Sequence, residues 1–331
     1  MIIKNEFLEK KLFNINLILC LLILTLYLLV NFKLYLLFFT ILLIGSPLIF
    51  FGKEKYKYHG IESQRNSRLG GLFIILSLVL IYFTSDMISY ENIIINNLNF
   101  YIIILLAISL LGLVDDVLGG VGNLIRLYFN IFGIVILLYT NQDFIFEYTK
   151  IEFVNVILQN NIIKSILTIF IIVGFINAAN MADGANGILS GISAVVFIIF
   201  YYETTNLIYF ALFEITFFFL IYNLFIGKVH LGDAGSYFLG FAIATNALYY
   251  YNLSLISAGL LATLLCYPSL EILMTISRRL IKLKNPLLPD NNHLHNIIHN
   301  KIKNKKFSIL NSNSFTGIIV LCIFSIPGLA L

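Results

Sequence analysis

The chain has 331 residues, of which 60% are hydrophobic and only 11% are charged, and its mean hydropathy is +0.93. This composition excludes a soluble globular domain, because such a domain needs a polar exterior. The formal net charge of +4 is small, and we expect membrane lipid around the protein and no nucleic acid as a partner. The sequence predicts an all-α polytopic integral membrane protein.

Long apolar runs recur along the whole chain. A hydrocarbon core of about 30 Å needs roughly 20 apolar residues per helix, and helices satisfy their own backbone hydrogen bonds in lipid. We expect about 11 transmembrane helices, near 12–30, 34–51, 71–88, 100–114, 121–140, 162–178, 187–202, 207–224, 236–250, 254–276 and 313–331. Residues 1–331 are predicted to form one membrane-embedded domain, with 1–33 as an extra N-terminal helix and 277–312 as a cytoplasmic loop rich in His and Lys.

Basic residues set the expected orientation. Most of the 21 Lys and Arg residues fall before the first run, after the second, or between 278 and 306. Short loops rich in Lys and Arg stay in the cytoplasm. The N-terminus is therefore predicted to be cytoplasmic, and the acidic motifs described next fall on the same side.

The first acidic motif lies in 109–120, SLLGLVDDVLGG. Asp115 and Asp116 are adjacent carboxylates, which repel each other unless a positive group lies nearby. A divalent cation or a lysine is the expected partner. The alternative is an acidic helix end at the membrane interface.

The second motif lies in 177–191, NAANMADGANGILSG. Asn177, Asn180, Asp183 and Asn186 recur every three residues, which predicts one polar stripe on a helix or turn. Amide groups can form hydrogen bonds with the edges of heterocycles and with sugar hydroxyls. The alternative is a polar loop between two helices.

The third motif lies in 228–236, KVHLGDAGS. Asp233 lies between two glycines, and Ser236 is predicted to cap the following helix. We expect this loop to offer one carboxylate to a metal and free backbone N–H groups to a phosphate.

The fourth motif is the basic segment 278–306, which holds Arg278, Arg279, His293, His295 and His299. Positive charge and imidazole donors favour phosphate binding. The alternative is that its lysines only fix the membrane topology or attract anionic lipid. A zinc site is disfavoured, because the i, i+4 histidine pair lacks a third ligand nearby.

These motifs, in this order, resemble the polyprenyl-phosphate N-acetylhexosamine-1-phosphate transferases of glycosyltransferase family 4. The match rests on VDD, N-A-x-N-x-x-D-G, G-D-x-G-S, the P-D-x-x-H-x-H loop, and the R-x-G-G element at Arg68. The family includes undecaprenyl-phosphate GlcNAc-1-phosphate transferases and, more distantly, the phospho-MurNAc-pentapeptide transferase.

The resemblance implies an activity and a location. A sugar-1-phosphate, expected to be an N-acetylhexosamine-1-phosphate, passes from a UDP-amino sugar to undecaprenyl phosphate. The products are undecaprenyl-pyrophosphoryl sugar and UMP, which is the first membrane step of cell-envelope glycan synthesis. Mg²⁺ is the expected cofactor, with Mn²⁺ as a substitute, and the active site faces the cytoplasm of a bacterial inner membrane. Self-association as a homodimer is left open.

The resemblance also implies roles for individual residues. Three carboxylates are expected to be catalytic and to ligate the metal, with an amide as a further ligand: Asp115, Asp116, Asp233 and Asn180. Side chains expected to bind substrate are Arg68, Asn177, Asn180, Asp183, Asn186, Arg278, Arg279, His293 and His295. Within that set, the histidines and the paired arginines are expected at the pyrophosphate, and Arg68 at the lipid phosphate.

The sequence departs from the family pattern in places, which keeps alternatives open. The common H-x-H-H pattern of the family appears here as His293-Leu294-His295-Asn296, so its third imidazole is lost unless His299 replaces it. Asn186 stands where a carboxylate is frequent. The alternatives are the phospho-MurNAc-pentapeptide transferase, a truncated non-catalytic scaffold, and a transporter. Acids gathered at one face, without an inverted repeat, argue against the transporter.

Overall fold

The computed structural model describes residues 67–84, 98–283, 292–303 and 310–329. The expected runs near 12–30 and 34–51, and the extra N-terminal helix at 1–33, lie outside these residues. Within them, regular structure is entirely helical, and the only β contact is an isolated parallel bridge between Ser67 and Val229. The all-α prediction is confirmed for the described part of the chain.

Most helices coincide with the predicted apolar runs. In chain order they are α3 (Gly70–Thr84), α4 (Leu98–Leu118), α5 (Asn123–Thr140), α6 (Glu152–Ile157), α7 (Asn161–Ala182), α8 (Ile188–Thr204), α9 (Leu207–Ile226), α10 (Gly232–Asn252), α11 (Ala258–Leu264), α12 (Cys266–Ile281), α13 (Leu294–Ile302) and α14 (Ser312–Phe324). Short 3₁₀ turns are η2 (Gln142–Phe144) and η3 (Ile326–Leu329).

The predicted number of about eleven spans is not confirmed. Among the described residues, four helices, α4, α5, α7 and α9, are long and apolar enough to cross a membrane. The run predicted at 254–276 is broken into α11 and α12, which meet at a bend of 72°, and this pair counts as a fifth span if it crosses. Helices α3, α8 and α14 are apolar but shorter.

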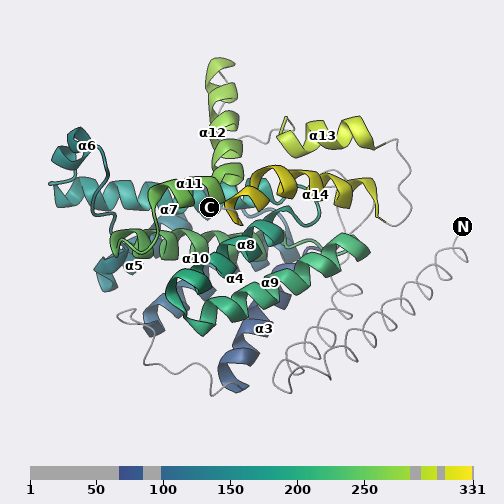
Figure 1. Ribbon diagram of the computed structural model, residues 1–331, viewed down its shortest axis with the longest axis horizontal. Helices are drawn as coiled ribbons and strands as arrows, with labels where there is room; N and C mark the ends of the chain where they lie inside the picture. The colour runs from purple at the N-terminus through teal and green to yellow at the C-terminus, as the bar shows by residue number, and fades with distance from the viewer. Residues whose placement is uncertain (1–66, 85–97, 284–291, 304–309, 330–331) are drawn as a thin grey trace, which may run out of the picture.

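Helix α10 forms the centre of the bundle (Figure 1) and is buried from Gly232 to Tyr251. It packs against α7, α4 and α3. Its polar side chains find partners inside the bundle: Tyr101 on α4 lies 3.0 Å from the Thr245 hydroxyl, and Tyr209 on α9 donates to Asn246 at 2.7 Å. Such pairing offsets the cost of burying polar groups. A central helix held from several sides gives its first turn a fixed position.

Glycines bring neighbouring helices close to the start of α10. A Cβ added at Gly112 on α4 would lie 2.5 Å from the backbone carbon of Asp233, and one at Gly71 on α3 would lie 2.1 Å from the backbone nitrogen of Gly235. Only glycine permits such approaches between backbones. The first turn of α10 is therefore wedged between α3 and the end of α4.

The segment predicted as a loop at 277–312 contains a helix. Helix α13 places His295, Ile298 and Ile302 on its less exposed face, and it packs against α14. Residues spaced by three or four lie on one side of a helix, so this segment has enough apolar surface to pack despite its charge. Helix α12 projects from the bundle beside it (Figure 1).

Candidate active site

Three acidic side chains meet where α4 ends and α10 begins. Asp115 and Asp116 lie in the last turn of α4, and Asp233 lies in the first turn of α10. Asp116 accepts the backbone N–H groups of Asp233 at 3.0 Å and of Ala234 at 2.9 Å, and its side chain is 0% exposed. An anionic acceptor at a helix N-terminus satisfies two unpaired donors and stabilises the helix dipole. Asp116 is thus the cap of α10.

This arrangement contradicts two expectations for the third motif. Ser236 does not cap α10, because the helix begins at Gly232, four residues earlier than expected. Its hydroxyl instead donates to the Asp233 carbonyl at 3.2 Å. The backbone N–H groups of Asp233 and Ala234 are not free for a phosphate, because Asp116 already binds them.

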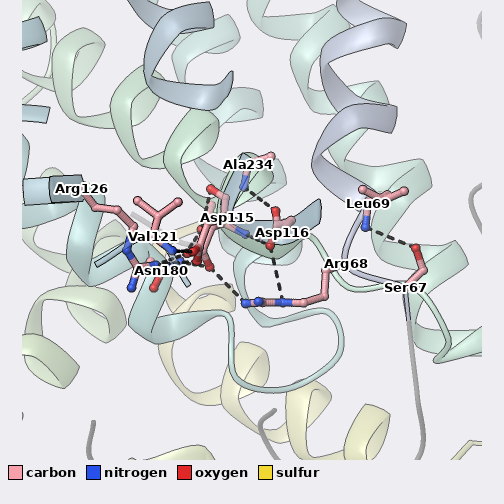
Figure 2. A network of polar contacts seen from close by, with 11 residues as sticks. Ser67, Arg68, Leu69, Asp115, Asp116, Val121, Arg126, Asn180 and Ala234 are labelled. Carbon is pink, nitrogen blue, oxygen red and sulfur yellow. Dashed lines mark hydrogen bonds and ion pairs between the residues drawn. The ribbon is translucent and has the colours of Figure 1, made fainter. Parts of the chain in front are cut away.

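Two arginines flank the acids from opposite sides (Figure 2). Arg68 lies 3.1 Å from Asp233 Oδ1 and 3.5 Å from Asp116 Oδ1. Arg126 Nη1 lies 3.1 Å from Asp115 Oδ2 and also contacts Asp233 Oδ2. Three carboxylates face two guanidinium groups, so these five side chains carry an excess of one negative charge when ionised.

Arg126 is a site residue that none of the four sequence motifs includes. It lies in the first turn of α5 and is the only charged residue of that helix. A charged side chain within a membrane segment normally has a partner or a function. That rule, applied to the helix directly after the Asp-Asp motif, is the signal that would have found it.

The second motif is divided by the end of α7. Asn180 donates to Asp233 Oδ1 and to Ser236 Oγ, both at 2.9 Å. Asn177 donates to the carbonyl of Val173, one turn back, at 2.7 Å. The structure therefore brings Asn180, but not the amide nitrogen of Asn177, into contact with the carboxylates.

Asp183 follows directly, at the C-cap of α7. Burial raises the pKa of its carboxyl well above the usual range, Arg68 opposes this shift, and Asp233 and Asp116 add to it. These electrostatic interactions place Asp183 beside the acid and arginine cluster. It is the second residue of its motif that the structure brings to the site.

Asn186 lies in a different environment. Its backbone N–H donates to Asn313 at 3.0 Å, and its side-chain amide donates to Ser314 at 3.1 Å. These contacts tie the turn after α7 to α14. The predicted stripe does not continue to Asn186, because the helical period stops at Ala182.

The histidines of the fourth motif are held against α12. The carboxylate of Glu271 accepts from His293 Nδ1 at 3.0 Å, and the Tyr267 hydroxyl lies 2.9 Å from His295 Nδ1. The two imidazole rings stack with centroids 5.2 Å apart. Glu271 and Tyr267 were not among the predicted site residues.

The histidines meet the turn that follows Asp183. A Cβ added at Gly184 would lie 1.9 Å from His295 Nε2, so the imidazole rests against this glycine. Arg278 and Arg279 lie in the last turn of α12, and Arg278 donates to Thr275 at 3.0 Å. The turn at 183–184 thus joins the histidine pair to the acid and arginine cluster.

The donor set suits a metal only in part. Among the residues that the structure describes, no three His, Cys, Asp or Glu side chains are arranged to hold one. Asp116 uses both oxygens on backbone N–H groups, but Asp115 Oδ2 and Asp233 Oδ2 converge on the same nitrogen of Arg126. Mg²⁺ is often held by one or two carboxylates together with substrate phosphates. The Asp115 and Asp233 pair fits that pattern.

Acid should destabilise the protein through two histidines. Burial lowers the pKa of both His295 and His230 to about 4. In the unfolded chain these groups bind protons near pH 6.5, so the free energy of unfolding should fall as the pH drops from about 6.5 to 4. We expect the thermal unfolding temperature of detergent-solubilised protein to fall over this window, and to fall less in His295→Asn. An equal fall in that variant would contradict the assignment to His295.

The structure defines a helical membrane protein with a cluster of buried carboxylates and partly exposed arginines at its helix ends. Residues 98–251, which contribute most of this cluster, match the sequence profile of glycosyl transferase family 4. The matched residues make up a little under half of the chain, and over them the chain is similar to that family.

Individual relatives agree with this assignment. The chain is 35% identical over 130 residues to an undecaprenyl-phosphate alpha-N-acetylglucosaminyl 1-phosphate transferase of Thermotoga maritima, covering 39% of this chain and 41% of the relative. It is 30% identical over 138 residues to a probable undecaprenyl-phosphate N-acetylglucosaminyl 1-phosphate transferase of Bacillus subtilis, covering 39% of this chain and 38% of the relative. It is 36% identical over 115 residues to a phospho-N-acetylmuramoyl-pentapeptide-transferase of Listeria innocua, covering 33% of this chain and 35% of the relative. The matched segments span about two fifths of the length of these relatives.

Proposed function

We propose that the protein transfers a sugar-1-phosphate, of the N-acetylhexosamine type, from a UDP-sugar to undecaprenyl phosphate. One observation carries the proposal: Asp115, Asp233, Arg68, Arg126 and Asn180 converge from separate elements on one cluster at the helix ends. The names of the Thermotoga and Bacillus relatives support this substrate pair.

The reaction joins two anionic substrates. An oxygen of the lipid phosphate attacks the phosphorus that bears the sugar, and the bond from that phosphorus to the UMP oxygen breaks with its electron pair. Such transfers are catalysed chiefly by positioning and by stabilising charge on the phosphoryl oxygens. Arg68 and Arg126 have the planar donor geometry that binds phosphate oxygens in pairs. Both are partly exposed, at 24% and 20% of their side chains, so substrate can reach them.

The acids have separate roles in this proposal. Asp115 and Asp233 would hold Mg²⁺, which would neutralise charge and polarise the phosphoryl group when bound. Asp116 stays on the backbone of α10 and keeps Asp233 in place. Asn180 and Asp183 lie toward the nucleotide, and His293 and His295 toward the pyrophosphate. The site is proposed to face the cytoplasm of a bacterial inner membrane, because the sequence assigns most Lys and Arg residues to the same side as the acidic motifs.

The test is a transfer assay with purified protein in detergent, radiolabelled undecaprenyl phosphate and a panel of UDP-sugars, each with and without Mg²⁺. We expect a lipid-pyrophosphoryl sugar with an equal amount of UMP, only with the metal, and most with a UDP-N-acetylhexosamine. Product only with UDP-MurNAc-pentapeptide would replace the proposed donor. Folded protein that gives no product with any donor would overturn the proposed function.

A further inference from the structure

Helix α12 supplies two buried polar groups that no proposed step uses. Glu271 is 4% exposed, and Tyr267 lies one helical turn before it at 2%. A buried carboxylate is costly unless its oxygens are paired. Both oxygens of Glu271 are paired, one with His293 Nδ1 at 3.0 Å and the other with the backbone N–H of Leu294 at 2.7 Å. These two hydrogen bonds join α12 to the histidine loop and to the first residue of α13.

The contacts determine which edge of each imidazole is available. Glu271 is an acceptor, so His293 donates from Nδ1, and Nε2 lies at the opposite edge of the ring. Tyr267 binds the same atom of His295, whose Nε2 rests against Gly184. Two side chains at positions i and i+4 on one helix thus bind the Nδ1 atoms of two stacked histidines. The nearly parallel rings, at 8°, follow from this spacing.

We infer that Glu271 and Tyr267 are positioning residues: they hold the stacked pair of His293 and His295 so that the Nε2 edge of His293 is presented to the phosphates of the nucleotide sugar. This inference rests on the proposed function. Groups behind a functional histidine fix its tautomer and orientation, and their loss at metal sites costs about 10–100-fold. Neither residue needs to contact substrate, since each acts through the histidine that it binds.

A simpler role for Glu271 would be to cap α13, since it also binds Leu294. Glu271→Gln separates the two roles. The amide oxygen still accepts the Leu294 N–H, but the NH₂ group that replaces the other oxygen cannot accept from His293 Nδ1. A cap alone predicts that this variant keeps its activity. Positioning predicts that kcat/KM for the UDP-sugar falls about 10–100-fold.

Double variants show whether each residue acts through its histidine. Glu271→Gln combined with His293→Asn should be no less active than His293→Asn alone. Once the His293 imidazole is absent, the side chain at position 271 has no ring to position. Tyr267→Phe combined with His295→Asn should behave the same way. Losses that multiply in the double variants would overturn the inference. The control is Glu147→Gln, which removes a carboxylate that pairs with Lys164 at 2.9 Å near the opposite end of α7, and it should match wild type.

Binding of UDP, measured by isothermal titration calorimetry, separates this inference from the proposed function. We expect wild type to bind UDP, and Glu271→Gln to bind it at least several-fold more weakly, whether or not transfer occurs. If wild type binds UDP but transfers nothing, the proposed function fails and the calorimetry still decides the role of Glu271. Equal affinities in the two proteins, or no binding by wild type, would overturn the inference.

Discussion

Asp233→Asn should lose at least about 100-fold in transfer activity, the scale for removing one charge-stabilising group from an active site. Asp233 is 3% exposed and accepts from Arg68 and Asn180 on one oxygen and from Arg126 on the other. An amide keeps the size of the side chain but removes the charge that balances the two arginines. It also presents an N–H₂ group to one of these donors. The measurement is kcat/KM in the transfer assay at saturating Mg²⁺.

The matched control for this variant is Asp143→Asn, the same change at an exposed acid in η2. We expect it to keep full activity. Asp233→Asn must be monodisperse in size-exclusion chromatography, so that lost activity is not lost folding. Wild-type activity in a folded Asp233→Asn protein would remove Asp233 from the catalytic cluster and, with it, the main support for the proposed site.

The sequence was sufficient to predict the elements that strong periodic signals define. The apolar runs near 100–114, 162–178 and 207–224 each lie within a helix of the structure. The acidic motifs at Asp116 and Asp233 meet although they are 117 positions apart. Charges at the ends of apolar runs must gather at a polar face, so this convergence follows from hydrophobicity and topology alone.

Contacts that depend on tertiary packing could not be predicted in this way. The capping role of Asp116 requires α4 and α10 to approach at Gly112, which no local pattern shows. Asn186 has the same spacing as Asn180, but α7 ends between them, and helix ends are the least certain feature of a sequence-based prediction. Glu271 looks like one polar residue on an amphipathic helix until the fold places the histidine loop beside it.

Gly112→Ala should abolish most of the activity while leaving the bundle folded. A methyl group here would lie 2.5 Å from the Asp233 backbone carbon and 2.6 Å from the Ala234 nitrogen. Backbone atoms cannot rotate away, so α10 must move relative to α4, and the hydrogen bonds of Asp116 to that backbone lengthen. Overpacking of this kind costs about 1–3 kcal/mol, and a displacement of about 1 Å at reacting groups costs roughly 100-fold in rate.

Gly174→Ala provides the matched control, because a Cβ at this helical glycine meets nothing within 4 Å. Alanine in a helix interior is favoured over glycine by about 0.5–1 kcal/mol, so this variant should be at least as heat-stable as wild type and equally active. Activity and unfolding temperature are measured on both variants in parallel. If Gly112→Ala also keeps wild-type activity, close packing of α4 against α10 does not set the position of Asp233. If both variants lose activity, the loss reflects a general sensitivity of the bundle to added methyl groups. Loss in Gly112→Ala alone locates the sensitive contact at the α4–α10 junction, where Asp116 holds the first turn of α10.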